Sequence, residues 1–245
     1  MAQGFKSFIP HFITLLNLFS GCVAVYQVSI EVYDLALAFV LLGIFFDFFD
    51  GLVARKLGVS SEVGIQLDSL ADMITSGLVP GFVLFKLLDN SLIQTGFTEG
   101  FFSWIPFLGF IVTAATGYRL AVFNIKGKES SDFIGLAAPA NALMIVSWPI
   151  MIENSKFTSI VYLFQNPIIL LIFVVVDIFL LNGTFKLFSF KLSDWSIQKN
   201  IFRYVFILIS VLLLVVLTYE ALTLIIMMYF ILSYFHLKQK KSASN

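Results

Sequence analysis

The fold is decided first by residues 34–55, which read DLALAFVLLGIFFDFFDGLVAR. About 20 consecutive apolar residues are enough for a helix to cross a bilayer, and this stretch is nearly free of charge before Asp47. Similar runs recur along the chain, in which 59% of residues are hydrophobic and only 12% are charged. Soluble domains are nearer to a quarter charged. The sequence therefore predicts an all-α integral membrane protein.

Hydropathy divides the chain into about eight predicted transmembrane helices, which form a single membrane domain over residues 1–245. With this arrangement every Lys and Arg except Lys86 and Lys156 falls on one side of the membrane. The positive-inside rule makes that side cytoplasmic, together with both termini. The predicted spans cover residues 11–30, 34–55, 65–87, 102–124, 135–152, 161–183, 201–219 and 221–237.

Four carboxylates lie inside or at the edge of the second and third predicted spans, where charge is costly. Asp47 and Asp50 are three residues apart, and Asp68 and Asp72 are four apart, so each pair shares a helix face. A short turn joins the two helices, and antiparallel packing can bring the pairs together. Gathered carboxylates repel each other unless cations join them. All-oxygen ligands suit Mg²⁺, Mn²⁺ or Ca²⁺, so we predict a divalent metal site here.

The face that carries Asp47 continues with Gly51, Ala54 and Arg55. The two small residues leave room for a ligand, although small residues also serve helix packing. Arg55 lies about 12 Å along the helix from Asp47, where it can bind phosphate or anchor the cytoplasmic end. Bound metals would neutralise a diphosphate, and one carboxylate could deprotonate an alcohol. The pattern indicates phosphoryl chemistry on a lipid.

These residues together resemble the signature of the CDP-alcohol phosphatidyltransferase family, Asp47-x-x-Asp50-Gly51-x-x-Ala54-Arg55 followed by Gly64, Asp68 and Asp72. The resemblance implies that an alcohol attacks the phosphate attached to the diacylglycerol of CDP-diacylglycerol, and that CMP leaves. It implies Asp47, Asp50 and Asp68 as metal ligands, with Asp72 also facing the metal as the general base. It implies that the CDP group is bordered by Asp50, Gly51, Ala54, Arg55 and Gly64.

Flanking residues are similar to bacterial phosphatidylserine synthases, notably residues 10–24, 68–72, 119–124 and 135–140. The chain departs from that subfamily at 75–77, where Thr-Ser-Gly replaces the frequent Ser-Phe-Gly, and at 135–137, where Gly-Leu-Ala replaces Gly-Leu-Pro. The resemblance implies L-serine as the acceptor and a bacterial-type inner membrane with the active site facing the cytoplasm. It also implies contact with membrane lipids and a homodimer.

Four further residues are candidate contacts to the acceptor or to phosphate: Arg119, Lys126, Asn17 and Thr14. Arg119 could instead snorkel, and Asn17 and Thr14 could instead bond to neighbouring helices. A sibling enzyme using glycerol-3-phosphate, an inositol phosphate or choline stays open, since Lys126 and Lys128 could hold a phosphorylated acceptor.

A cation transporter would instead place acids deep in several spans, often with broken helices. His11 and His236 are isolated and are predicted to be interfacial or structural. No nucleic-acid partner is expected, because no basic cluster is interleaved with aromatics. No organic cofactor is expected either.

Overall fold

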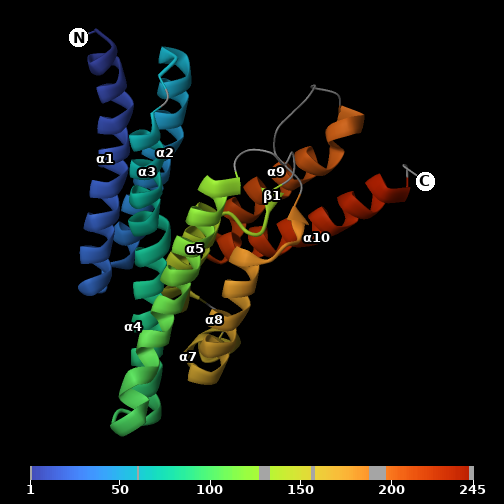
Figure 1. Cartoon of the computed structure of the whole chain (residues 1–245). Coiled ribbons are helices and arrows are strands. Elements are labelled where there is room, and N and C mark those ends of the chain that lie inside the picture. Colours follow the sequence, from blue (N-terminus) through green and yellow to red (C-terminus); the bar gives the residue numbers. More distant parts are fainter. Residues whose placement is uncertain (1, 60, 127–132, 156–157, 188–196, 243–245) are drawn as a thin grey trace.

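The computed structural model describes residues 2–59, 61–126, 133–155, 158–187 and 197–242. Within those residues the regular structure is helical, apart from two short antiparallel strands, β1 (Phe133–Ile134) and β2 (Lys186–Leu187). The helices, shown in Figure 1, are α1 (Ala2–Ser29), α2 (Tyr33–Leu57), α3 (Glu62–Asp72), the π-helix η1 (Met73–Leu78), α4 (Val79–Thr95), the 3₁₀ helix η2 (Gly100–Gly109), α5 (Phe110–Lys126), α6 (Ala138–Asn154), α7 (Thr158–Gln165), α8 (Pro167–Asn182), α9 (Ile197–Leu217) and α10 (Glu220–Ser242).

The turn between α2 and α3 is set by local chemistry at both helix ends. α2 ends at Gly58, whose φ of 63° is left-handed and suits a residue without Cβ. α3 begins after Ser61, whose Oγ accepts a hydrogen bond of 3.0 Å from the Gly64 N–H. The chain therefore reverses within a few residues, and α3 returns antiparallel to α2 (Figure 1).

The apolar helices agree with a membrane protein. Among the described residues, four helical segments are long and apolar enough to cross a membrane, namely Phe8–Ser29, Tyr33–Leu57, Glu62–Thr95 and Gly100–Ile125. The same part of the chain has three shorter apolar helices, at Pro167–Asn182, Ile201–Leu217 and Glu220–Ser233. The helical character of the fold is confirmed, whereas the count of eight spans and the side on which the termini lie stay predictions.

The predicted sixth span, 161–183, is two helices rather than one. Pro167 has no N–H to donate to α7 and disfavours helical backbone at the residue before it, so α7 ends at Gln165. Asn166 then caps α8, its Oδ1 accepting from the Ile168 N–H at 2.9 Å. The segment Glu62–Thr95, in contrast, is one continuous helix, because the π-helical turn η1 joins α3 to α4 without a break.

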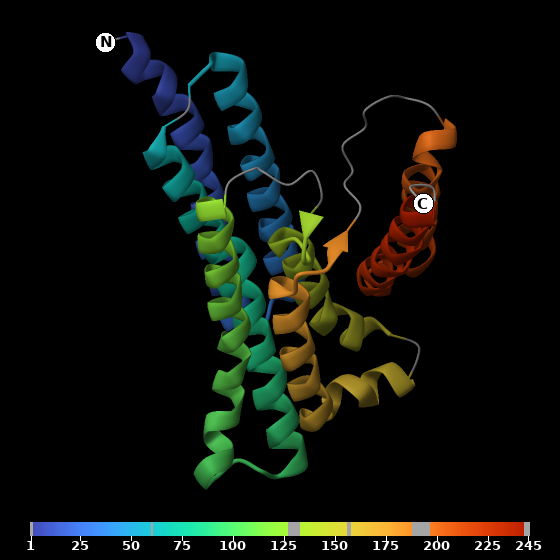
Figure 2. The same ribbon diagram turned by 45° about the vertical axis from the view of Figure 1, so that its right-hand side comes forward.

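The later helices pack around aromatic side chains. Trp148 of α6 is buried, with ring centroids 4.9 Å from Phe164 and 5.2 Å from Phe173. Buried Asp177 of α8 accepts a 3.0 Å hydrogen bond from the Asn141 side chain. α9 and α10 form a hairpin, and its α10 helix packs on α6 and β2. The hairpin projects away from α1 and α2 (Figure 2).

Candidate active site

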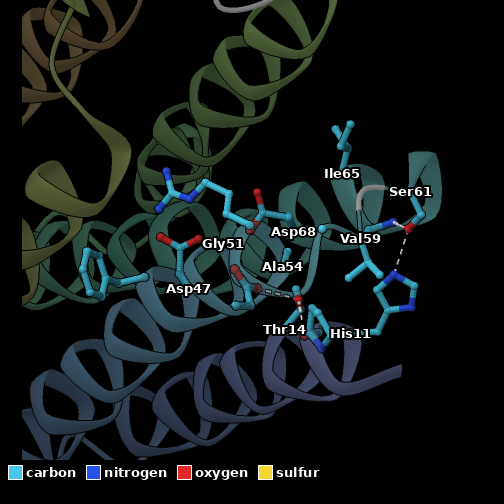
Figure 3. A pocket seen from close by; sticks show the side chains of 15 residues that line it. His11, Thr14, Asp47, Gly51, Ala54, Val59, Ser61, Ile65 and Asp68 are labelled. Atoms are coloured by element: carbon cyan, nitrogen blue, oxygen red, sulfur yellow. Dashed lines mark hydrogen bonds between the residues drawn. The ribbon is translucent and has the colours of Figure 1, made fainter. Parts of the chain in front are cut away.

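Three of the four acidic side chains that the sequence predicted to gather lie together in the structure. Carboxylate oxygens of Asp47, Asp50 and Asp68 all lie within 4.8 Å of one another. Asp50 is buried and the other two are half-buried. Figure 3 shows Asp47 and Asp68 on facing helices, with their carboxylates on the same side of the pocket. The antiparallel turn at Gly58–Ser61 is what brings Asp68 to Asp47 and Asp50.

Helix α1 supplies hydrogen-bond donors to Asp50 and to the fourth acid, Asp72. The buried Thr14 hydroxyl lies 2.5 Å from Asp50 Oδ2, and Asn17 Nδ2 donates to Asp72 Oδ1 at 3.2 Å. The sequence left open whether Thr14 and Asn17 face the acids or only neighbouring helices. The structure places both against the acids.

The cluster fits a hard divalent cation. Asp68 Oδ1 is buried, and within the described part of the chain it has no hydrogen-bond partner. A buried carboxylate oxygen without a partner is unfavourable, and a cation among Asp47, Asp50 and Asp68 would compensate it. Oxygen-only ligands favour Mg²⁺, Mn²⁺ or Ca²⁺ over softer metals.

A pocket of about 480 Å³ opens beside the acids. A Cβ built at Gly51 would meet no atom within 4 Å, so this glycine keeps the helix backbone accessible from the pocket. Arg55 is exposed at the wall of the same pocket. The lining residues come from α1, α2, α3 and the turn between the last two: Pro10, His11, Thr14, Asp47, Phe48, Asp50, Gly51, Ala54, Arg55, Gly58, Val59, Ser61, Gly64, Ile65 and Asp68.

The lining residues that were not predicted to belong to the site include two with polar side chains, His11 and Ser61. His11 Nε2 lies 2.9 Å from Ser61 Oγ, and this hydrogen bond ties α1 to the turn that precedes α3 (Figure 3). The signal was present in the sequence, because His11, Thr14 and Asn17 are spaced three apart and share a helix face. Reading His11 as isolated missed that it extends a polar stripe.

Comparison with known proteins identifies the family. The profile of the CDP-alcohol phosphatidyltransferase family matches residues 7–180, which is more than half of the chain and includes all four acids. The chain belongs to the CDP-alcohol phosphatidyltransferase family. The long apolar helices and the membership of this lipid-synthesising family together make the chain an integral membrane protein.

Relatives of this phosphatidyltransferase carry the name CDP-diacylglycerol–serine O-phosphatidyltransferase. The protein from Bacillus subtilis is 31% identical over 144 residues, which cover 57% of this chain and 74% of the relative. The protein from Methanocaldococcus jannaschii is 31% identical over 153 residues, 62% of this chain and 65% of the relative. The Helicobacter pylori (strain 26695) protein is 27% identical over 224 residues, 91% and 87% of the two chains.

Arg119, another candidate contact of this phosphatidyltransferase, is not among the described residues that line the pocket. Arg119 of α5 is partly buried, and its Nε donates to the Leu181 carbonyl at the end of α8 at 3.1 Å. The reciprocal contact runs from Asn182 Nδ2 to the Ala115 carbonyl at 3.2 Å. Arg119 therefore links α5 to α8. Lys126 is the last residue of α5, and its side chain lies outside the described residues, as does all of Lys128.

Proposed function

We propose that this phosphatidyltransferase transfers the phosphatidyl group of CDP-diacylglycerol to L-serine and releases CMP. The observation that carries the reaction class is the convergence of Asp47, Asp50 and Asp68 at a pocket that also exposes a glycine backbone and an arginine. The choice of serine is supported by the names of relatives that are 26–31% identical to this chain.

The CDP group would lie along the wall made by Gly51, Ala54, Arg55 and Gly64. Open space at Gly51 lets a diphosphate approach the helix backbone, and the Arg55 guanidinium suits phosphate oxygens. A divalent cation, Mg²⁺ or Mn²⁺, held by Asp47, Asp50 and Asp68 and faced by Asp72 would supply the positive charge that makes CMP a better leaving group. Asp50 would also border the nucleotide, since it lines the pocket.

Asp72 would act as the general base. Its carboxylate would take the proton from the serine hydroxyl while the serine oxygen forms a bond to the phosphorus that carries diacylglycerol. The bond from that phosphorus to the oxygen of CMP would break, and CMP would leave with the electron pair. Asp72 lies one helical turn beyond Asp68 and is held by Asn17, so it is separate from the oxygens that cluster around the metal position.

The candidate contacts to the acceptor come from α5 and α1. Arg119 and Lys126 stay predicted contacts to the serine carboxylate or to phosphate, while Thr14 and Asn17 would act through Asp50 and Asp72. The pocket lies at the end of α2 that carries Arg55 and Lys56, which supports an active site facing the cytoplasm. A homodimer in the inner membrane remains part of the proposal.

The test is CMP release by detergent-purified protein given CDP-diacylglycerol and Mn²⁺ or Mg²⁺, with and without L-serine. Serine-dependent release should fall by about 10²–10⁴-fold in Asp72→Asn, because the variant lacks a general base. Asp177→Asn is the matched control, since Asp177 is a buried carboxylate outside the pocket, and it should keep its activity.

The outcomes separate the acceptor from the reaction. Release with glycerol-3-phosphate, an inositol phosphate or choline, and not with serine, would change the acceptor and keep the catalytic site. Folded, metal-supplied protein that releases no CMP with any of these alcohols would overturn the proposed activity.

A further inference from the structure

The helix that carries Asp72 changes its winding directly after that residue. α3 ends at Asp72, and the π-helix η1 begins at Met73. π-helical turns are rare and often mark functional sites, since each one inserts an extra residue into a helix face. In this turn Thr75 is 1% exposed, although it carries a hydroxyl group.

Helices α1 and α2 both approach Thr75 closely. A Cβ added at Gly21 of α1 would lie 2.8 Å from Thr75 Oγ1, and one added at Gly43 of α2 would lie 2.6 Å from Thr75 Cγ2. Only glycine leaves room for such contacts. Thr75 is therefore held from two sides, at the place where three helices meet.

A chain of hydrogen bonds runs from Thr75 to Asp72 through Asn17. The Thr75 hydroxyl donates to Asn17 Oδ1 at 2.7 Å, and Asn17 Nδ2 donates to Asp72 Oδ1 at 3.2 Å. A hydroxyl has one hydrogen, and its other acceptors, the carbonyls of Ala71 and Asn17, are farther away at 3.0 and 3.4 Å.

This order of donors fixes the orientation of the Asn17 amide. With its oxygen bound to Thr75, the amide presents its NH₂ group to Asp72, and an NH₂ group can only donate. Asp72 Oδ1 must then accept, which leaves its second oxygen to take a proton from the substrate. Without the Thr75 hydroxyl the amide could turn its own oxygen toward Asp72, where two acceptors would repel each other.

We propose that Thr75 and Asn17 are positioning residues for Asp72, and that they set its orientation for proton transfer without touching the substrate. The inference rests on the proposed function, because it gives Asp72 its role as the base. Both residues act through Asp72 and are not part of the wall formed by Gly51, Ala54, Arg55 and Gly64, so their loss should slow the chemical step and leave substrate binding unchanged.

The first test compares three variants by CMP release. Thr75→Val keeps the shape and removes the hydroxyl, and it should lower kcat by about 10- to 100-fold, as the loss of an outer-shell partner typically does. The KM for CDP-diacylglycerol and for serine should stay at the wild-type value. Thr75→Ser should retain most of kcat. The matched control is Thr116→Val, because Thr116 is fully buried and donates to the Val112 carbonyl in its own helix.

The second test asks whether Thr75 acts through Asp72. In an Asp72→Asn background, Thr75→Val should cause no further loss of kcat, because residues that act as a unit are not additive. Asn17→Leu should also lower kcat and leave KM unchanged. It replaces Thr75→Val as the test if Thr75→Val does not fold in detergent.

The results distinguish this inference from the proposed function. Equal losses from Thr75→Val in both backgrounds, a rise in KM in place of a fall in kcat, or wild-type kcat in both Thr75→Val and Asn17→Leu would overturn the positioning role alone. Wild-type protein without CMP release would overturn the proposed function and this inference with it.

Discussion

The first helices and the C-terminal hairpin are both rich in apolar residues, yet they are built differently. Around the acids, α1, α2, α3 and η1 bury polar side chains against one another, including Thr14, Asn17, Asp50 and Thr75. The hairpin α9–α10 also exposes large apolar side chains, such as Leu208 and Val215 at 72% and 76%, but few of its described polar side chains are buried. It joins the body by contacts such as the 3.0 Å bond from Trp148 Nε1 to Thr223.

This difference indicates where the sequence is constrained by chemistry. Buried polar groups need partners at fixed distances, so the first region tolerates little change. A lipid-facing helix needs apolar surface, which many side chains supply. The family profile agrees, since it ends at residue 180, before the hairpin begins.

The largest effect should come from Asp68, whose buried Oδ1 has no hydrogen-bond partner in the described chain and which lies beside Asp47 and Asp50. Asp68→Asn keeps the shape but removes a charge from the predicted metal site. We expect CMP release to fall by at least about 1,000-fold, because metal stabilisation of the charge on the leaving CMP is worth several kcal/mol. Asp89→Asn, on α4 and outside the pocket, is the charge-matched control and should be active.

A thermal melt in detergent should show that both proteins are folded. Activity of Asp68→Asn within tenfold of wild type, with metal saturating, would mean that the cluster is not the metal site.

Alanine substitutions at two glycines of α2 should have smaller effects, and these effects should differ from each other. Alanine at Gly43 would place its Cβ 2.6 Å from Thr75 Cγ2 and 2.8 Å from Asn17 Oδ1, whereas alanine at Gly51 would meet nothing within 4 Å. We expect Gly43→Ala to lower the free energy of unfolding by about 1–3 kcal/mol, the usual cost of overpacking, and to lower kcat. Gly51→Ala should keep wild-type stability and raise the KM for CDP-diacylglycerol.

Melting temperatures and initial rates measured side by side would check this pair. Equal stability of the two variants would show that helix packing near Thr75 is looser than the structure indicates.

The sequence predicted the acids well because their geometry is local. Spacings of three and four residues place Asp47 with Asp50 and Asp68 with Asp72, and one short turn brings Asp68 to Asp47 and Asp50. The helix boundaries around Pro167 were also open to prediction, since proline disfavours a continuous helix. The predicted continuous span of 161–183 gave too much weight to hydropathy and too little to that residue.

The hydrogen-bond chain around Asp72 could not be predicted in the same way. Thr75 and Asn17 are far apart in the sequence, and their contact depends on the crossing of α1 with η1. The π-helical turn has no clear pattern in the residues Met73–Leu78, because its register follows from packing against Gly21 and Gly43. Arg119 was read from its position alone, and tertiary structure gave it a carbonyl partner at Leu181.

The smallest effect should come from the link between the hairpin and the body. Thr223→Val leaves the indole N–H of buried Trp148 without its acceptor. Hydrogen bonds between membrane helices are worth about 0.6 kcal/mol on average, so the melting temperature should fall only slightly. The kcat and KM of CMP release should be unchanged, since Thr223 lies outside the acid-lined pocket.

Tyr219→Phe is the matched control at the same hairpin, because it removes only the exposed 3.2 Å bond to Asp34 and should change stability less. A fall in kcat for Thr223→Val as large as that of Gly43→Ala would break the division between the two regions. It would mean that the position of α6 against α10 is transmitted through the body to the acids, and that the hairpin takes part in shaping the site.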